Sequence, residues 1–353
     1  MFGLGKQKGI VGLDIGSSSV KVVELRKKGA DYELANLGME SLGQDIVVDG
    51  AIMDSFSVST AIEKIFNDNK IKTTEVATAV SGHSVIVKKI AVNAPTEDEV
   101  ANAIPYEAQQ YIPFDMADVN LSYQVLGPAA AGPGFEIMLV AVKRDKILNH
   151  TNVLSQAGKT PVVVDIDAFA LQNAFEVNYE PSPDRMIALL NIGASIMNIN
   201  ILRGGVPLFT RDVSVGGNQY TDTLQKELDL SFDDAEKLKQ GQQVTTATPE
   251  QASPHIHSVS EILLLEVQKT IDFFKQTTSA ENSIQQIYVA GGTAKIQGLV
   301  DMLKEEFGIP VEIMNPFQRV EVNASKFDAS YINEIAPRMS VAVGLALRSF
   351  DTP

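Results

Sequence analysis

Two segments of the sequence place glycine and small polar residues directly after a nearly continuous apolar run. The first extends from Ile10 to Gly16, and apolar residues resume at Val20 after three serines. This pattern predicts a buried strand, a tight turn and a returning strand. Backbone N–H groups of such a turn can hold phosphate oxygens, because glycine has no side chain to clash. The candidate phosphate-binding residues of this turn are Gly16, Ser17, Ser18 and Ser19.

Two charged residues flank this turn. Asp14 lies at the end of the predicted strand, where a carboxylate can bind magnesium through its water shell, since this ion keeps several waters. Lys21 lies on the returning strand and could contact a phosphate as a point charge. A single turn of this kind is more often a tight hairpin with solvated serines, so its interpretation depends on the rest of the chain.

A second segment, Ile187 to Ser195, repeats the first one residue for residue, half a chain later. Asp14 corresponds to Asn191 and Gly16 to Gly193. A repeat of half the chain length with a turn at the same place predicts two lobes of like fold. The candidate residues of the second turn are Asn191, Gly193, Ala194 and Ser195.

Two glycine pairs add to these turns. Gly216 and Gly217 follow another strand pattern, and Gly291, Gly292 and Thr293 lie between a predicted strand and a predicted helix over residues 294–307. A glycine pair lets the backbone approach a flat base or a ribose, and a helix N-terminus favours a nearby anion. Glycine turns that alternate with strands in both halves together favour a nucleotide held between two lobes.

The chain is long for one compact core, with 353 residues, so two lobes with inserted parts are expected. The net charge of −15 argues against nucleic-acid binding, which needs a basic face. Without cysteine, the chain has no disulfide, thiolate metal site or cysteine nucleophile. The sequence contains no run of about 18 uncharged apolar residues, so no membrane-spanning helix is predicted and a cytoplasmic protein is expected.

The same patterns predict the boundaries of the domains. We expect the first lobe core over residues 1–80 and 161–185, an inserted subdomain over 81–160, and the second lobe over 186–353, with 218–286 as its smaller subdomain. The insert is predicted to run strand, helix, strand, strand, helix, strand, and its first helix is expected to start with a capping box of Thr96 and Glu99. The polar residues 242–257 are expected to form a loose loop before a long helix over 259–277.

Taken together, the glycine turns resemble those of the actin-like ATPases. In that superfamily they form two phosphate loops and an adenosine motif, which here correspond to residues 12–19, 190–195 and 289–293. Residues 235–239 are similar to a helix whose Glu and Lys hold ribose and base in bacterial actins, and the matching residues are Glu236 and Lys239. Without the other motifs this would be a solvated helix face. The resemblance implies ATP and magnesium as cofactors.

More closely, the chain resembles the PilM family of type IV pilus assembly proteins over essentially its whole length. The stretches that carry the resemblance are 1–4, 11–25, 163–171 and 341–348. It implies an α/β chain of the actin-like ATPase fold, with two ribonuclease-H-like lobes and an inserted subdomain of the type shared by FtsA and PilM. It also implies an ATP-binding scaffold that lies at the inner membrane by binding the N-terminal cytoplasmic tail of PilN, with other pilus machinery proteins as further candidate partners.

Two positions bear on ATP hydrolysis. Asn191 stands where many actin-like ATPases have an acid that helps to hold magnesium and water, and an amide cannot act as a base. Asp165 matches the acid that orients the attacking water in some relatives, and Asp167, the next residue but one, is expected to point to the same face of the strand. Both acids could equally do no more than end a strand. Slow or absent hydrolysis is therefore expected, with Asp165 as the catalytic candidate.

The insert carries none of the nucleotide motifs, so a second role is expected for it. Its short strands have edges that can accept a peptide, and its helix 97–111 mixes acids with Ile104, Tyr106 and Tyr111. We expect a groove there for the PilN tail; homotypic contacts are the alternative. Two other functions stay open: a small-molecule kinase of the same fold with Asp165 or Asp167 as base, and an FtsA-like division protein, whose C-terminal amphipathic anchor we do not find.

Overall fold

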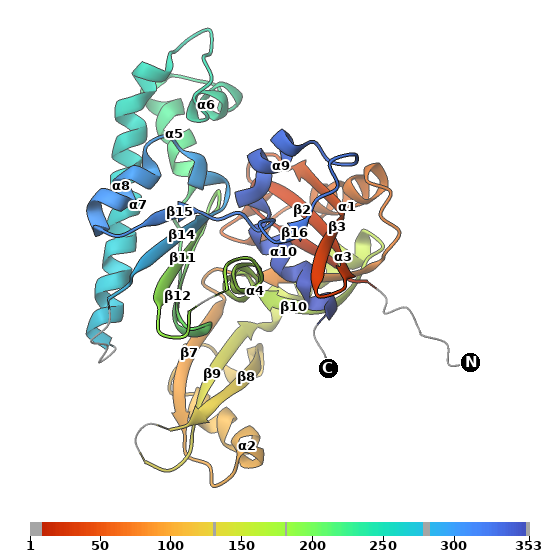
Figure 1. Ribbon diagram of the computed structural model, residues 1–353, viewed down its shortest axis with the longest axis vertical. Coiled ribbons are helices and arrows are strands. Elements are labelled where there is room, and N and C mark those ends of the chain that lie inside the picture. Colours follow the sequence, from red (N-terminus) through yellow and green to blue (C-terminus); the bar gives the residue numbers. More distant parts are fainter. Residues whose placement is uncertain (1–8, 130–131, 181, 278–282, 351–353) are drawn as a thin grey trace.

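A computed structural model describes residues 9–129, 132–180, 182–277 and 283–350 (Figure 1). The first lobe contains a six-stranded sheet of order β10-β6-β1-β2-β3-β16. Strands β1, β2 and β3 form an antiparallel meander, and β6 and β10 continue the sheet in parallel. The strands are β1 (Val11–Ile15), β2 (Ser19–Lys28), β3 (Asp31–Ser41), β6 (Glu75–Val80), β10 (Thr160–Ile166) and β16 (Val320–Glu321).

The second lobe repeats this arrangement in a five-stranded sheet of order β13-β12-β11-β14-β15. Again three strands form an antiparallel meander and two follow in parallel. The strands are β11 (Met186–Ile192), β12 (Met197–Arg203), β13 (Val206–Val213), β14 (Gln286–Ala290) and β15 (Val311–Ile313). The prediction of two lobes of like fold is confirmed by this common strand order.

Two helices lie between the lobes, α4 (Asp167–Tyr179) and α10 (Ser340–Leu347). α10 packs against both α4 and β1, and glycine permits the close approach: a Cβ at Gly344 would overlap the carbonyl of Ala170, and one at Gly12 would overlap that of Ala342. Two further helices, α1 (Ser55–Asp68) and α3 (Arg144–Gln156), contribute to the apolar core with Val11, Leu13 and Ile15. The C-terminal helix of the described chain is therefore part of the packing between the lobes.

The second lobe carries α5 (Gly217–Leu228), α6 (Phe232–Lys239), α7 (Pro249–Thr277) and α8 (Leu299–Phe307), with α7 running along its outer side (Figure 1). The predicted loose loop over 242–257 is wrong for 249–257, because Ala252 and Ile256 pack against apolar residues of α5 and α6 and draw this polar segment into α7. The predicted helix 294–307 is interrupted: Gly298 has φ +82°, and α8 begins after it.

The insert projects from the two lobes (Figure 1). Its antiparallel sheet has the order β7-β9-β8, with β7 (Val85–Val92), β8 (Val119–Pro128) and β9 (Phe135–Lys143), and α2 (Glu97–Ala108) closes its core. The expected capping box is wrong, because the Thr96 side chain makes no capping hydrogen bond. Helix α3, by contrast, places Val153 and Leu154 in the first-lobe core.

The remaining elements are short: β4 (Val47–Val48), β5 (Ala51–Ile52), α9 (Ala329–Ile335) and the 3-10 helices η1 (Met116–Asp118), η2 (Gly292–Lys295), η3 (Ala336–Met339) and η4 (Arg348–Phe350). Within the described ranges, no helix combines the length and the apolar character that crossing a membrane requires.

Candidate functional site

The first phosphate-loop candidate is the turn between β1 and β2. The N–H of Gly16 donates to the carbonyl of Ser19 at 3.0 Å and closes the turn, as predicted, and the carbonyl of Ser18 accepts from Leu42 N at 2.9 Å. Next to the turn, Lys21 Nζ lies 2.8 Å from Asp14 Oδ2. The two strands place these side chains opposite each other in register, so the charged residues meet beside the turn.

The second turn, between β11 and β12, has the same geometry. The N–H of Gly193 donates to the carbonyl of Ile196 at 2.9 Å, which is the bond that Gly16 makes in the first lobe. The register partners are here two amides, and Asn191 Nδ2 donates to Asn198 Oδ1 at 2.9 Å. An amide pair thus occupies the place of the Asp14–Lys21 ion pair.

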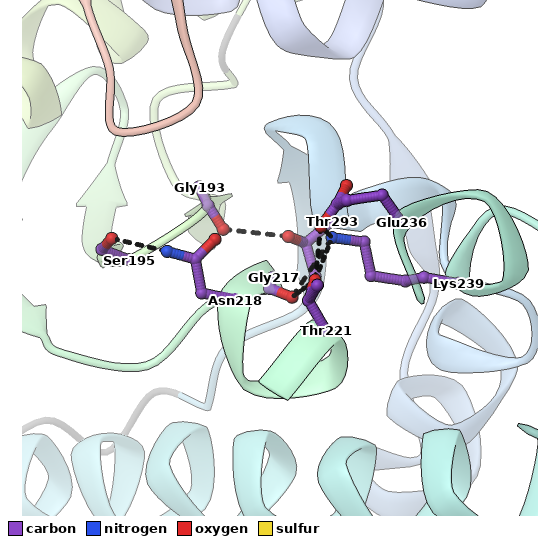
Figure 2. A network of polar contacts seen from close by, with 8 residues as sticks. All are labelled: Gly193, Ser195, Gly217, Asn218, Thr221, Glu236, Lys239 and Thr293. Atoms are coloured by element: carbon purple, nitrogen blue, oxygen red, sulfur yellow. Dashed lines mark hydrogen bonds and ion pairs between the residues drawn. The ribbon is translucent and has the colours of Figure 1, made fainter. Parts of the chain in front are cut away.

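Both turns present backbone donors. Among the described residues, the N–H groups at the tips of the turns, those of Ser17, Ser18, Ala194 and Ser195, have no protein acceptor. The Ser195 hydroxyl accepts a hydrogen bond from Asn218 Nδ2 at 3.2 Å (Figure 2). Backbone donors of this kind fit an anion with several oxygens, such as a phosphate chain.

The glycine pair at the start of α5 packs against the second turn. The N–H groups of Gly217 and Asn218 donate to the carbonyls of Gly193 and Ala194, at 2.9 and 2.8 Å. A Cβ on Gly216 would collide with the same carbonyls. The start of α5 therefore supports the second turn, and these two N–H groups are not available to a phosphate.

Glu236 and Lys239 of α6 face the start of α5, as Figure 2 shows. Lys239 Nζ pairs with Glu236 and donates to Thr221 Oγ1 at 2.8 Å, and the Thr221 hydroxyl donates to Glu236. Burial lowers the pKa of Lys239, while the negative charge of Glu236 opposes this shift. The two residues that were matched to a ribose and base site thus lie together at the second turn.

The segment after β14 completes this side of the site. Gly291 has φ +86° and donates to the carbonyl of Pro337 at 2.8 Å, and the Thr293 hydroxyl donates to the carbonyl of Gly193 at 2.9 Å (Figure 2). The atoms nearest to a Cβ on Gly292 would belong to the Arg338 side chain, the closest at 3.3 Å. Gly292 is therefore bordered by a cation that sequence reasoning did not single out.

The two acids near the end of β10 do not act as a pair. β10 ends at Ile166 and Asp167 is the first residue of α4, so the expectation that both acids share a strand face is wrong. Asp165 is held by Arg348, whose Nε and Nη2 lie 2.8 and 2.6 Å from Asp165 Oδ2. Its role in catalysis remains a prediction.

Asp167 lies among the charges of the site. Desolvation raises the pKa of Asp167 to about 7, and the charges of Asp14 and Asp212 act in the same direction. A hydrogen bond with Ser81 and the charge of Lys146 oppose the shift. Burial lowers the pKa of Lys146, which donates to the carbonyl of Gly50. Asp167 is therefore an acid that feels the negative charge of Asp14.

Further polar residues of the site escaped the sequence analysis. Asn198 could have been found, because the repeat matches it to Lys21 and places it in an apolar strand. Asp212 on β13 gave no such signal, although it accepts from Asn198 Nδ2 at 2.8 Å and from the Gly82 N–H at 2.6 Å. Lys146 and Arg338 reach the site from elements distant in sequence, which no local pattern reveals.

The donor set fits a magnesium nucleotide. A carboxylate at Asp14 suits a hard cation, unpaired backbone donors suit phosphates, and Glu236, Lys239 and the Gly292 backbone suit the sugar and base. Within the described residues, no group of three or more His, Cys, Asp and Glu residues could hold a metal ion by itself. A metal at Asp14 would accordingly need other ligands, such as phosphate oxygens and water.

The architecture defines the class of protein: two repeated lobes around paired turns form the actin-like ATPase fold. MreB5 of Spiroplasma citri, solved with ADP, has this fold at a TM-score of 0.54 and 14% identity, over 96% of this chain and 94% of that one. The structure of a PilM–PilN type IV pilus biogenesis complex is far more similar, with a TM-score of 0.87 and 28% identity over 98% of this chain and 99% of that one.

The model of the family described as type IV pilus assembly protein PilM matches residues 12–350. The chain therefore belongs to this PilM family. A more distant relative is the cell division protein FtsA of Streptococcus pneumoniae, which is 23% identical over 87% of this chain and 75% of its own length. The family match favours pilus assembly over the kinase and cell-division alternatives.

Proposed function

We propose that this chain is an ATP-binding scaffold of type IV pilus assembly that captures the N-terminal cytoplasmic tail of PilN. ATP binding is supported by one observation, the pair of matched turns with free backbone donors. The first turn also has Asp14 and Lys21 beside it. The partner half is supported by family membership and by the similarity to a solved PilM–PilN complex.

In this proposal ATP lies between the lobes with magnesium. The two turns bind its phosphates, Asp14 holds magnesium through water, and Lys21 exchanges its bond with Asp14 for a phosphate oxygen. Glu236 and Lys239 contact the ribose and base, and Gly292 lets the base approach the backbone. Magnesium supplies charge neutralisation to the phosphates. We place the hydrolytic acid at Asp167 in preference to Asp165, because Arg348 already engages the Asp165 carboxylate.

Calorimetry with ATP in the presence and absence of magnesium tests the nucleotide half. Lys21→Ala should weaken ATP binding, whereas Lys28→Ala on the same strand should not, since the Lys28 pair with Glu321 is exposed. No binding at millimolar ATP by folded wild-type protein would refute the nucleotide site. Equal losses in the two variants would refute the role of Lys21.

For the peptide we propose a cavity of about 240 Å³ at the base of the insert, and not the face of α2. Among the described strands β7 is hydrogen-bonded to β9 alone, so its other edge can pair with an extended peptide. The cavity walls come from both lobes and from the insert. They include Val80, Val85 and Val87 as apolar groups and Asp167 and Asp212 as acids.

A tail bound at this place would hold the chain at the inner membrane through PilN. Val87→Glu on β7 should abolish capture of a synthetic PilN tail in a pull-down, and Tyr123→Glu on the exposed part of β8 is the matched control. Replacing residues 85–142 by a short linker, which keeps α3 in the first-lobe core, should likewise remove capture and leave ATP binding intact. Undiminished capture by both altered proteins would show that the tail binds elsewhere; a change in oligomeric state alone would indicate homotypic contacts.

A further inference from the structure

Three successive residues lead from the first lobe into the insert, and each is held from outside the insert. Ser81 bonds to Asp167 at the start of α4. The Gly82 N–H donates to Asp212 Oδ2 at 2.6 Å, and His83 Nε2 lies 3.1 Å from the Ser214 hydroxyl. Asp212 and Ser214 both belong to the second lobe. The segment Ser81–His83, which we call the link, is thus connected to both lobes.

The bond to Gly82 is the end of a polar row across the second-lobe sheet. Asn191, Asn198 and Asp212 are register partners on the neighbouring strands β11, β12 and β13. Asn191 Nδ2 donates to Asn198 Oδ1 at 2.9 Å, and Asn198 Nδ2 donates to Asp212 Oδ1 at 2.8 Å. One unbroken series of hydrogen bonds therefore runs from the base of the second turn to the backbone of the link.

The burial of this row favours a common movement of its three side chains. Asn198, in its middle, is 2% exposed, so water does not readily replace either of its bonds. A Cβ on Gly82 would touch the Ile196 side chain, and Ile196 closes the second turn through its carbonyl. The link therefore lies against the same turn that the row begins from. Figure 1 shows β7 starting beside the second-lobe sheet.

We propose that Asp212 is a positioning residue that couples the nucleotide site to the peptide site through the row Asn191–Asn198–Asp212 and the Gly82 N–H. The inference rests on the proposed function and adds its regulation. A ligand that spans both turns restrains Asn191, the row restrains the link, and the link sets where β7 presents its free edge. Coupling of this kind is reciprocal, so the peptide strengthens nucleotide binding by the same factor.

Hydrogen exchange provides a direct test, because the Gly82 N–H is itself an exchanging group. In the wild type, ATP with magnesium should slow exchange in peptides that cover the link. Asn198→Leu interrupts the row but keeps the Asp212–Gly82 bond, so the link should stay protected while its response to ATP is lost. Ser214→Ala, which removes only the His83 contact, is the matched control and should keep the response.

The second readout is the ratio of dissociation constants for a synthetic PilN tail with and without ATP. Coupled sites commonly show about 5- to 150-fold effects, and the ratio should fall toward one in Asn198→Leu. A direct loss of peptide contact would alter both constants and leave the ratio unchanged. Asp212→Asn should retain part of the coupling, because a row of three amides can invert its donors and acceptors.

Different results would overturn the proposed function and the proposed coupling. If calorimetry shows that ATP or the tail does not bind to wild-type protein, the proposed function fails and the coupling falls with it. If both bind but ATP leaves the exchange of the link unchanged, the coupling alone is overturned. An equal response in wild type and Asn198→Leu likewise overturns it.

Discussion

The two turns at the centre of the molecule share a backbone and differ in charge. In the first lobe Asp14 and Lys21 form an ion pair at 2.8 Å; in the second the same register positions hold Asn191 and Asn198 at 2.9 Å. An ion pair can exchange its partners for a metal ion and a phosphate. An amide pair offers no net charge, but it can extend a hydrogen-bonded row, as it does here to Asp212.

The two turns can therefore serve different functions although they come from one repeated motif. The charged turn is suited to holding the ligand, whereas the neutral turn is suited to reporting on it. Substitutions at matched positions can distinguish these roles, because the same backbone hydrogen bond, from Gly16 or Gly193, closes each turn.

The largest difference is expected for Asp14→Ala against Asn191→Ala. Losing a charged ligand should weaken magnesium-dependent ATP binding on the order of 100-fold, since hydrogen bonds to charged groups contribute about 1.5–3 kcal/mol. Losing the neutral amide of Asn191 should weaken the same binding only about fivefold, because a neutral hydrogen bond contributes less. Calorimetry at fixed magnesium measures both. Similar losses would show that the charge of the first turn is not what binds the ligand.

Gly193→Ala against Gly16→Ala should separate the turns by stability. A Cβ on Gly193 would lie 2.9 Å from the carbonyl of Ile196, which is backbone and cannot move aside. A Cβ on Gly16 would meet the end of the Lys21 side chain at 3.0 Å and the equivalent carbonyl, that of Ser19, only at 3.3 Å. We expect a loss of about 1–3 kcal/mol in the free energy of unfolding for the first variant and clearly less for the second. Urea denaturation decides, and equal losses would contradict the packing argument.

Acidic pH should lower the free energy of unfolding through a buried group in the first-lobe half of the chain, which also carries Asp14 and Lys21. Burial lowers the pKa of His150 on α3 from 6.5 to about 4, so the unfolded chain binds a proton first as the pH falls. Stability is therefore lost from pH 6.5 downward, by about 1 kcal/mol near pH 5.5. His150→Asn should flatten this part of the stability profile. An unchanged slope in thermal or urea unfolding would show that another group is responsible.

The smallest effect is expected on hydrolysis. Turnover of the wild type should lie below the usual enzyme range of about 1–1000 per second, because Asn191 cannot accept a proton. Asn191→Asp should raise it about fivefold, but not in an Asp14→Ala background. Phosphate release measures both, and wild-type turnover within the usual range would contradict the assignment.

Local sequence patterns were sufficient to predict much of the fold of this protein. Apolar runs that end in glycine predicted both turns, and the half-chain repeat predicted two lobes, because strand and turn preferences act within a few residues. The extent of α7 was missed, since its first residues become helical through burial of Ala252 and Ile256 and not through their own propensity. The proposed preference for Asp167 over Asp165 was also missed, because it depends on Arg348, which engages the Asp165 carboxylate.

By itself the sequence determined the fold, the family resemblance and the residues of the two turns, since these depend on hydrophobic pattern and on glycine at close backbone contacts. Only the tertiary structure decided which groups are already engaged. Arg348 pairs with Asp165 across 183 positions, and Asp212 reaches Gly82 across 130. Such contacts are set by how the lobes and the insert pack, and side chains brought together in this way leave no spacing in the sequence by which to recognise them.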